Sequence, residues 1–173
     1  MNIIRRFKYI QLRKRLKRIR LIILDFDGVL TNNTVYVSEH GVESVSCSRS
    51  DGPGVKILRS TGLQLLVLST ETNPVVARRC SKLSLECNQG ISSKSDFILR
   101  EIMHTRQYAM SELLYVGNDL NDLTAMKLGM ITACPSDSHY LVRRQADIIL
   151  SRRGGHGVTL DLVGHLFQCN PHR

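Results

Sequence analysis

Residues 21–33, LIILDFDGVLTNN, decide the fold of this chain. Four apolar residues at the start of this stretch run without interruption into Asp25, and Asp27 follows two positions later, just before Gly28. A short apolar run bounded by turn residues indicates a strand buried on both faces, as in a parallel sheet. Ligands of open α/β sheets bind outside the carboxyl ends of such strands. We therefore expect Asp25 and Asp27 at the functional edge of a parallel sheet.

The two carboxylates predict a metal site if they work together. Carboxylates this close repel one another unless a cation lies between them or one of them holds a proton. Oxygen ligands in a small site suit Mg²⁺, which commonly binds one or two carboxylates together with substrate phosphate. A bare pair of aspartates two residues apart also occurs where both side chains cap a turn. The pair alone leaves both interpretations open.

The composition indicates one globular domain. The chain has 173 residues, of which 42% are hydrophobic, enough for a sizeable core. Its five cysteines form no CxxC pair, and the odd number argues against a disulfide framework. We therefore expect a reducing, cytoplasmic setting. No apolar run approaches the roughly 18 residues of a membrane span, and no signal-peptide pattern follows the N-terminal charges.

The net charge of +9 is concentrated in residues 1–20, the basic leader, which hold nine Lys or Arg and no acidic residue. The remaining residues, 21–173, are expected to form the single domain and hold 15 basic and 15 acidic residues. Three interpretations of the leader stay open. It is a helix that packs Leu12, Leu16 and Ile19 on the domain, a segment attracted to anionic lipid, or a nucleic-acid-binding arm. The last is disfavoured because no aromatic stacking platform accompanies the charge.

Apolar strands alternate with helical patterns along the rest of the chain, which predicts βαβ units in a mostly parallel, Rossmann-like sheet. The expected strands cover residues 21–24, 63–68, 85–87, 113–116, 130–134 and 148–150. The expected helices follow residue 52 and cover about 74–83, 95–107, the segment ending at 128, 139–144 and the segment ending at 167. Residues 34–47 predict a β-hairpin with its turn at 39–41. This insertion is too small to be a cap domain.

The whole string DFDGVLT at residues 25–31 resembles the first motif of the haloacid dehalogenase superfamily of phosphotransferases. The resemblance implies that Asp25 is the nucleophile that forms an aspartyl-phosphate, and that Asp27 is the general acid and base. A carboxylate nucleophile divides one difficult displacement into two easier ones. Phosphate-monoester hydrolysis needs such help, since its uncatalysed rate demands acceleration of up to ~10²¹-fold.

Three later segments match the remaining motifs of the superfamily, each near the end of an expected strand. Ser69 matches the hydroxyl that binds a phosphoryl oxygen, and Lys94 matches the lysine that offsets phosphoryl charge. Residues 117–122, GNDLND, match the acidic motif that completes the metal site. Singly, these residues are also explained as a helix cap, a solvated charge and the first turn of a helix. Their order along the chain favours the enzymatic interpretation.

The resemblance therefore implies an Mg²⁺ site with a defined set of ligands. Asp25, Asp27 and Asn118 would hold the metal, with Asp119 as a substitute or supporting ligand. The motif often has aspartate directly after its glycine, and Asn118 departs from that pattern. An amide oxygen still ligates Mg²⁺, although with less charge. The order of Asn118 and Asp119 as ligands stays open.

A longer match, over about residues 15–167, resembles the small capless phosphatases of 3-deoxy-ulosonic acid sugars. This branch includes KDO 8-phosphate phosphatases, sialic-acid-type (nonulosonate) 9-phosphate phosphatases and the phosphatase-like domain of some CMP-sialic acid synthetases. The resemblance implies a role in carbohydrate or lipopolysaccharide biosynthesis. It also implies a homotetramer in which a neighbour's hairpin and tail help to close each active site. The predicted substrate contacts are Ser69, Thr70, Glu71, Asp51 and Lys94.

Two positions bear on the substrate. Glu71 stands where KDO 8-phosphate phosphatases tend to have arginine, and a carboxylate there disfavours pairing with a sugar carboxylate. We therefore expect a nonulosonate 9-phosphate first and KDO 8-phosphate second. Leu160 replaces an arginine of the tail motif, which removes a contact to substrate or neighbour. The alternative function is a weakly active or inactive oligomerisation module linked to CMP-sialic acid synthesis.

Overall fold

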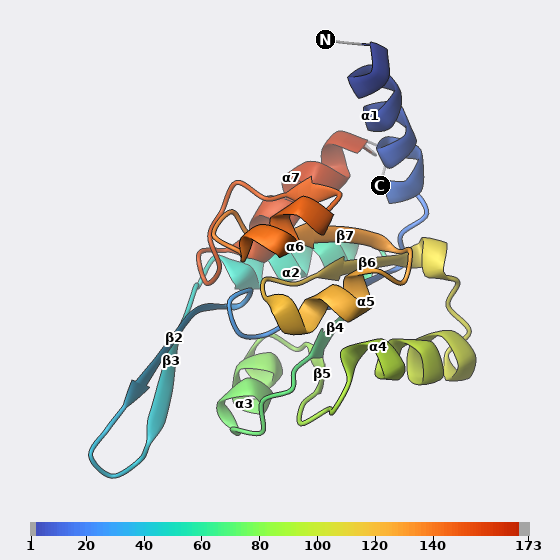
Figure 1. Ribbon diagram of the computed structural model, residues 1–173. Coiled ribbons are helices and arrows are strands. Elements are labelled where there is room, and N and C mark those ends of the chain that lie inside the picture. The colour runs from blue at the N-terminus through green and yellow to red at the C-terminus, as the bar shows by residue number, and fades with distance from the viewer. Residues whose placement is uncertain (1–2, 170–173) are drawn as a thin grey trace.

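A six-stranded parallel sheet in the order β5-β4-β1-β6-β7-β8 forms the centre of the molecule, as Figure 1 shows. The computed structural model describes residues 3–169. The strands are β1(Leu21–Leu24), β4(Gln64–Leu68), β5(Glu86–Asn88), β6(Leu113–Val116), β7(Ile131–Cys134) and β8(Ile148–Ile149). The predicted α/β class and parallel sheet are therefore confirmed.

Helices cover both faces of this sheet. The α-helices of the described residues are α1(Ile3–Leu16), α2(Asp51–Ser60), α3(Val75–Lys82), α4(Lys94–Phe97), α5(Leu123–Met126), α6(Tyr140–Gln145) and α7(Val158–Cys169), of which all but α1 lie over the sheet. Shorter or wider helical segments are η1(Ile98–Thr105), η2(Met110–Glu112) and η3(Leu120–Asp122). Apolar residues of α2, α3 and α7 join one core cluster, and those of η1, α5 and α6 join the other.

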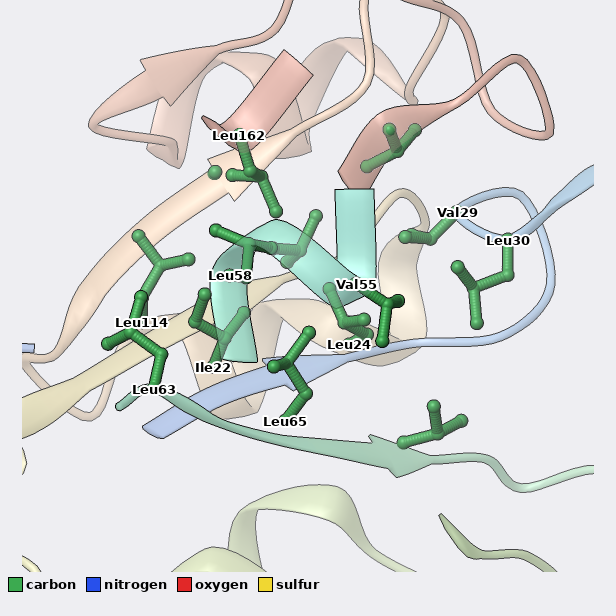
Figure 2. Close-up of a cluster of buried hydrophobic side chains, with 14 of the residues drawn as sticks. Ile22, Leu24, Val29, Leu30, Val55, Leu58, Leu63, Leu65, Leu114 and Leu162 are labelled. Atoms are coloured by element: carbon green, nitrogen blue, oxygen red, sulfur yellow. The ribbon is translucent and has the colours of Figure 1, made fainter. Parts of the chain in front are cut away.

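The apolar run that precedes Asp25 fills both clusters. Successive residues of a strand point to opposite faces, so Ile22 belongs to one cluster and Ile23 to the other, and both are fully buried. Figure 2 shows the first cluster, where Leu58 of α2 and Leu162 of α7 lie over the sheet on the same side as Ile22. The central strand is thus held from both sides, and it presents Asp25 at its carboxyl end.

The predicted hairpin is confirmed as a separate two-stranded antiparallel sheet, β2(Thr31–Val37) and β3(Glu43–Cys47). Gly41 has a φ of +73°, which places the expected turn in the left-handed conformation that glycine favours. Figure 1 shows the hairpin extending away from the sheet. Four large apolar side chains on it are 50% to 65% exposed: Val35, Tyr36, Val37 and Val42.

The basic leader includes helix α1, which extends away from the rest of the molecule in Figure 1. At its base, Leu16 and Ile19 are buried in the first core cluster. Arg15 donates from Nη2 to the carbonyl of Gly129 at 3.3 Å. Residues 1–2 of the predicted leader and 170–173 of the predicted domain lie outside the described residues. No helix among the described residues is long and apolar enough to cross a membrane.

The helix expected over 95–107 has a different form. Residues 94–97 are α-helical, and the chain continues as the π-helical segment η1. Its wider turns carry the hydrogen bond from the amide of Arg106 to the carbonyl of Glu101 at 2.9 Å. The two buried residues, Ile98 and Ile102, are four positions apart and fit either helix. Apolar spacing over a single turn therefore does not distinguish the two forms.

Candidate active site

Asp25 lies at the carboxyl end of β1, between β4 and β6. Its amide donates to the carbonyl of Val116 at 2.9 Å, so strand pairing continues as far as this residue. Asp25 Oδ1 accepts from the amide of Phe26 at 2.7 Å, and the residue is 4% exposed. The backbone thus fixes the carboxylate in a buried position at the edge of the sheet.

Lys94, the first residue of α4, reaches the same carboxylate. Its Nζ lies 2.7 Å from Asp25 Oδ1 and 2.7 Å from Asp122 Oδ1, and the lysine is 3% exposed. A buried ammonium is stable only when it is paired and hydrogen-bonded. Ser93 caps the helix by accepting from the amide of Asp96 at 3.3 Å, which positions Lys94 at its start.

Asp122 and Tyr115 complete this network, and neither was among the predicted site residues. Asp122 Oδ1 also accepts from the hydroxyl of Tyr115 at 2.6 Å. Asp122 Oδ2 accepts from the amides of Asn118 and Asp119 at 2.8 and 3.2 Å. The carboxylate therefore anchors both Lys94 and the loop after β6. A signal was present, because Asp122 closes the acidic motif and Tyr115 is a polar residue inside an apolar strand.

The charges in this cluster shift one another's titration. Burial, followed by the neighbouring Asp122 carboxylate, raises the pKa of Asp25 to about 7, against the opposing effect of Lys94. Burial lowers the pKa of Lys94, but Asp25 and Asp122 together raise it by more, so it lies above its usual range. Lys94 is therefore charged at neutral pH. A divalent cation beside Asp25 would restore its ionised form.

The side-chain amide of Asn118 lies on the other side of Asp25. With its nitrogen turned toward the site, it donates to Asp25 Oδ2 at 3.2 Å and to the carbonyl of Asp27 at 2.7 Å. Among the described residues, no three His, Cys, Asp or Glu side chains are placed to hold a metal ion. One carboxylate, one main-chain carbonyl and one amide oxygen are nevertheless suitable ligands for Mg²⁺, which takes its remaining ligands from water and substrate. This donor set fits the metal that the sequence predicts.

Asp119, the other predicted ligand, caps a helical turn. Its Oδ1 accepts from the amide of Leu120 at 2.7 Å and caps η3, and the residue is exposed. It lines a cleft of about 230 Å³, which Asn118 also lines. The other residues that line this cleft are Gly28, Asn33, Asn118, Asp137, Ser138 and His139.

Asp27 is held by the turn that follows the strand. Thr31 donates from Oγ1 to Asp27 Oδ1 at 3.3 Å, and the amide of Gly28 donates to the same hydroxyl at 3.1 Å. Burial raises the pKa of Asp27; the hydrogen bond from Thr31 opposes this shift, and the charges of Glu71 and Glu43 add to it. A half-buried carboxyl with a raised pKa is suited to carry a proton to a leaving group.

The predicted hydroxyl at Ser69 lies at the end of β4, the neighbour of β1. It is 2% exposed, and its Oγ accepts from the amide of Glu71 at 3.1 Å. Glu71 Oε1 accepts from the amides of Thr72 and Asn73 at 2.6 and 2.8 Å, so its carboxylate is held within the loop. Thr70, between them, is exposed. The loop 69–73 therefore follows a strand next to β1 and presents both a hydroxyl and a carboxylate.

The structure does not support the predicted substrate contact of Asp51. Asp51 is fully buried, and its Oδ1 accepts from the amide and the hydroxyl of Thr159 at 3.2 and 3.0 Å. It joins the start of α2 to the start of α7 and has no exposed surface for a ligand. The prediction is corrected: this carboxylate ties two helices together, a contact between residues 108 positions apart that no local pattern reveals.

A glycine loop of the same chain closes over the turn after Asp25. A Cβ at Gly154 would lie 2.1 Å from the carbonyl oxygen of Gly28, and the amide of Gly155 donates to the carbonyl of Val29 at 3.0 Å. Gly154 also donates to Asp137 Oδ1 at 2.9 Å. The loop therefore needs glycine for a close backbone approach that supports the site.

Comparisons with known proteins point to one group of enzymes, although no protein-family model matches the chain. An HAD family hydrolase from Streptomyces avermitilis has 37% sequence identity and a TM-score of 0.83, and the match covers 88% of this chain and 87% of that one. The 3-deoxy-D-manno-octulosonate 8-phosphate phosphatase of Escherichia coli K12 is 27% identical over 147 residues, which are 84% of this chain and 78% of that protein.

A third relative carries a metal. The cobalt-bound form of the deoxy-D-mannose-octulosonate 8-phosphate phosphatase from Haemophilus influenzae has a TM-score of 0.83 and 26% identity. The match covers 91% of this chain and 92% of that one. The resemblance that the sequence motifs suggested is therefore confirmed over most of the chain.

Proposed function

Because the chain belongs to the haloacid dehalogenase (HAD) superfamily and is a phosphoric monoester hydrolase of that type, we propose that it dephosphorylates a 3-deoxy-ulosonic acid sugar through an aspartyl-phosphate on Asp25. One observation carries this proposal. Asp25 contacts the Lys94 ammonium through one oxygen, and its other oxygen lies beside the Asn118 side-chain amide, which also lies next to the Asp27 carbonyl.

The chain's own residues account for two displacements. Asp25 attacks phosphorus in line, the bond to the sugar oxygen breaks, and Asp27 gives its proton to that oxygen. Asp27 then takes a proton from water, which attacks phosphorus and breaks the bond to Asp25, so inorganic phosphate leaves. Lys94 and Ser69 bind the phosphoryl oxygens during both steps.

We propose Mg²⁺ as the cofactor, held by Asp25 Oδ2, the Asp27 carbonyl and the Asn118 oxygen. When bound, a divalent ion neutralises phosphoryl charge and orients the reacting groups. The closeness of the Asn118 side chain to Asp25 Oδ2 and to the Asp27 carbonyl supports the site, and the cobalt-bound relative supports a divalent ion.

Two substrates within this class remain as proposals. The named relatives are KDO 8-phosphate phosphatases. Glu71 supports a nonulosonate 9-phosphate instead, since it and Glu43 lie close enough to Asp27 to raise its pKa. Both substrates carry a carboxylate, so this negative potential favours whichever of them presents hydroxyl or amide donors near the leaving group. We place the nonulosonate 9-phosphate first and KDO 8-phosphate second.

Phosphate release from a panel of sugar phosphates with Mg²⁺ tests the proposal. We expect turnover of ulosonic acid phosphates well above that of glucose 6-phosphate, and a loss of at least about 1,000-fold in Asp25→Asn. The exposed Asp96 on α4 offers a matched control, and Asp96→Asn should retain activity. Wild-type turnover in Asp25→Asn would refute the aspartyl-phosphate route.

Glu71→Arg tests the order of the two substrates. If Glu71 selects against a nearby carboxylate, this variant should shift the ratio of kcat/KM toward KDO 8-phosphate. An unchanged ratio would show that Glu71 does not select the sugar. A wild-type protein inert toward the whole panel would favour the alternative function, an oligomerisation module.

A further inference from the structure

The basic leader is the part of the chain that the proposed function leaves unused. Residues 1–20 hold nine Lys or Arg and no acidic residue, whereas residues 21–173 hold 15 basic and 15 acidic residues. The positive charge of the protein is therefore concentrated on one segment of a domain that is otherwise neutral. Because a concentration of one charge attracts partners of the opposite charge, the leader is suited to an anionic partner.

Helix α1 and the turn after it hold this charge away from the sheet. Figure 1 shows α1 and the hairpin extending from opposite ends of the molecule. Lys14 and Arg18 are exposed, and Ile10 on the same segment is 43% exposed. This surface therefore presents basic side chains together with an apolar one.

The base of α1 is fixed to the domain. Leu16 and Ile19 are buried in the first core cluster, and Arg15 Nη1 lies 3.7 Å from Asp147 Oδ1. Burial of two apolar side chains holds the end of the helix against the body. A partner that binds the exposed part of the leader therefore binds the whole protein.

The residue types of α1 favour a lipid surface over a nucleic acid. Residues 3–10, IIRRFKYI, set large apolar residues among three basic ones. A helix of this composition binds at the headgroup level of an anionic membrane, where phosphates meet the charges and the acyl boundary accepts apolar groups. A nucleic-acid backbone interacts with the charges alone, and it offers no apolar surface to the exposed Ile10.

We propose that the basic leader binds the surface of a membrane that contains anionic phospholipids. The leader joins the first residue of β1, and Asp25 lies beyond the opposite end of that strand. A membrane in contact with the leader therefore leaves the active site open to solvent. The contact is electrostatic in the main, so it depends on the anionic lipid and on the salt concentration.

Sedimentation of the full-length protein with lipid vesicles tests the proposal. We expect the protein to sediment with vesicles of equal parts phosphatidylglycerol and phosphatidylcholine, and to stay in solution with phosphatidylcholine alone. Bound protein should be released at about 1 M salt, where the Debye length falls to about 3 Å. Equal binding to both kinds of vesicle, or binding that persists at this salt concentration, would overturn the proposal.

Charge reversal locates the contact on the leader. Each Lys or Arg near an anionic surface strengthens binding by about fivefold, so Lys14→Glu, Arg18→Glu should weaken vesicle binding by at least about tenfold. Lys56→Glu, Arg100→Glu is the matched control, because these residues are exposed on α2 and η1 and give the same net charge. The control should bind within about threefold of wild type. Equal losses in both double variants would overturn the proposal.

Two further arms separate the leader's charge from its folding and from a competing partner. Lys14→Gln, Arg18→Gln removes the charges without adding acidic ones, and it should bind more weakly than wild type with an unchanged circular dichroism spectrum. Single-stranded RNA, added at the same phosphate concentration as the lipid, should leave most of the protein on the vesicles. Wild-type binding in the glutamine variant, or transfer of the protein to RNA, would overturn the proposal.

Vesicle binding is measured without a sugar phosphate, so its outcome is independent of the proposed function. A protein that binds the anionic vesicles but hydrolyses nothing would refute the proposed function alone.

Discussion

The hydroxyl of Tyr115 and the ammonium of Lys94 share a single oxygen of Asp122, at 2.6 and 2.7 Å. In the proposed aspartyl-phosphate the Asp25 carboxylate has lost its charge, and Asp122 is then the carboxylate that holds Lys94. The hydroxyl of Tyr115 takes part of the hydrogen-bonding capacity of that oxygen, so it leaves Lys94 freer to turn toward the phosphoryl group. We regard Tyr115 as a positioning residue that acts through Asp122.

Tyr115→Phe should therefore lower kcat by about tenfold while KM changes less than threefold. Hydrogen bonds to charged groups contribute about 1.5–3 kcal/mol. A change of about 1.4 kcal/mol in the activation free energy changes the rate tenfold. Steady-state kinetics on a phosphomonoester measures both constants. Tyr108→Phe, in the same core cluster, is the matched control and should leave kcat unchanged. A parallel loss in both variants would indicate general loosening of the core.

The close packing of Gly154 leads to a second prediction, which concerns stability. A Cβ there would lie 2.1 Å from the carbonyl oxygen of Gly28, and backbone on both sides limits relaxation. Gly154→Ala should lower the free energy of unfolding by more than about 2 kcal/mol and reduce turnover. Gly164 in α7 has nothing within 4 Å of a Cβ, so Gly164→Ala should stabilise by about 0.5–1 kcal/mol. Urea unfolding of both variants measures the contrast.

At the scale of elements, the packing of α2 on α7 depends on a buried carboxylate. Asp51 Oδ1 accepts two hydrogen bonds from Thr159, while its Oδ2 has no hydrogen-bond partner. Burial raises the pKa of Asp51, and the hydrogen bonds from Thr159 oppose this shift. The Asp51 carboxylate therefore binds a proton more tightly in the folded protein than in the unfolded chain.

Asp51→Asn should change the pH dependence of stability. With a folded pKa above the unfolded value of 3.8, the wild-type protein loses stability as pH rises from that value through the folded pKa. The variant lacks this loss, so its stability relative to wild type should increase with pH across this window. Urea unfolding of both proteins at several pH values measures the difference. A difference independent of pH would refute the assigned shift.

Local sequence patterns predicted the elements well because a strand buried on both faces is a run of consecutive apolar residues. The apolar runs before Asp25 and Gly117 gave β1 and β6 with their bounds as observed. Order along the chain predicts the motif residues, such as Lys94 at the start of α4 and Asn118 after β6. Asp51 was misplaced and Tyr115 was missed, because their roles depend on partners that sequence spacing does not identify.

At the scale of the whole molecule, the exposed hairpin predicts assembly. Figure 1 shows the hairpin extending from the body, and its Tyr36 and Val37 side chains are 59% and 65% exposed. Exposed apolar patches on soluble proteins commonly mark protein contacts. We propose that the hairpin packs against other copies of the chain in a homotetramer.

The double variant Tyr36→Ser, Val37→Ser should shift the protein from a tetramer to smaller species in light scattering after gel filtration. Leu99→Ser is the matched control, because Leu99 is also exposed and apolar but lies on η1; it should leave the mass unchanged. A wild-type monomer, or a tetramer that survives the double variant, would contradict the proposal.

The position of β1 between two parallel neighbours has a consequence for the order in which parts of the molecule unfold. Amides in a strand hydrogen-bonded on both sides and covered on both faces exchange with solvent only when the whole domain opens. Asp25 is attached to that most persistent segment, whereas the hairpin and the basic leader lie outside it. On gentle heating, the outlying segments should loosen first, and the nucleophile should keep its place until the global transition.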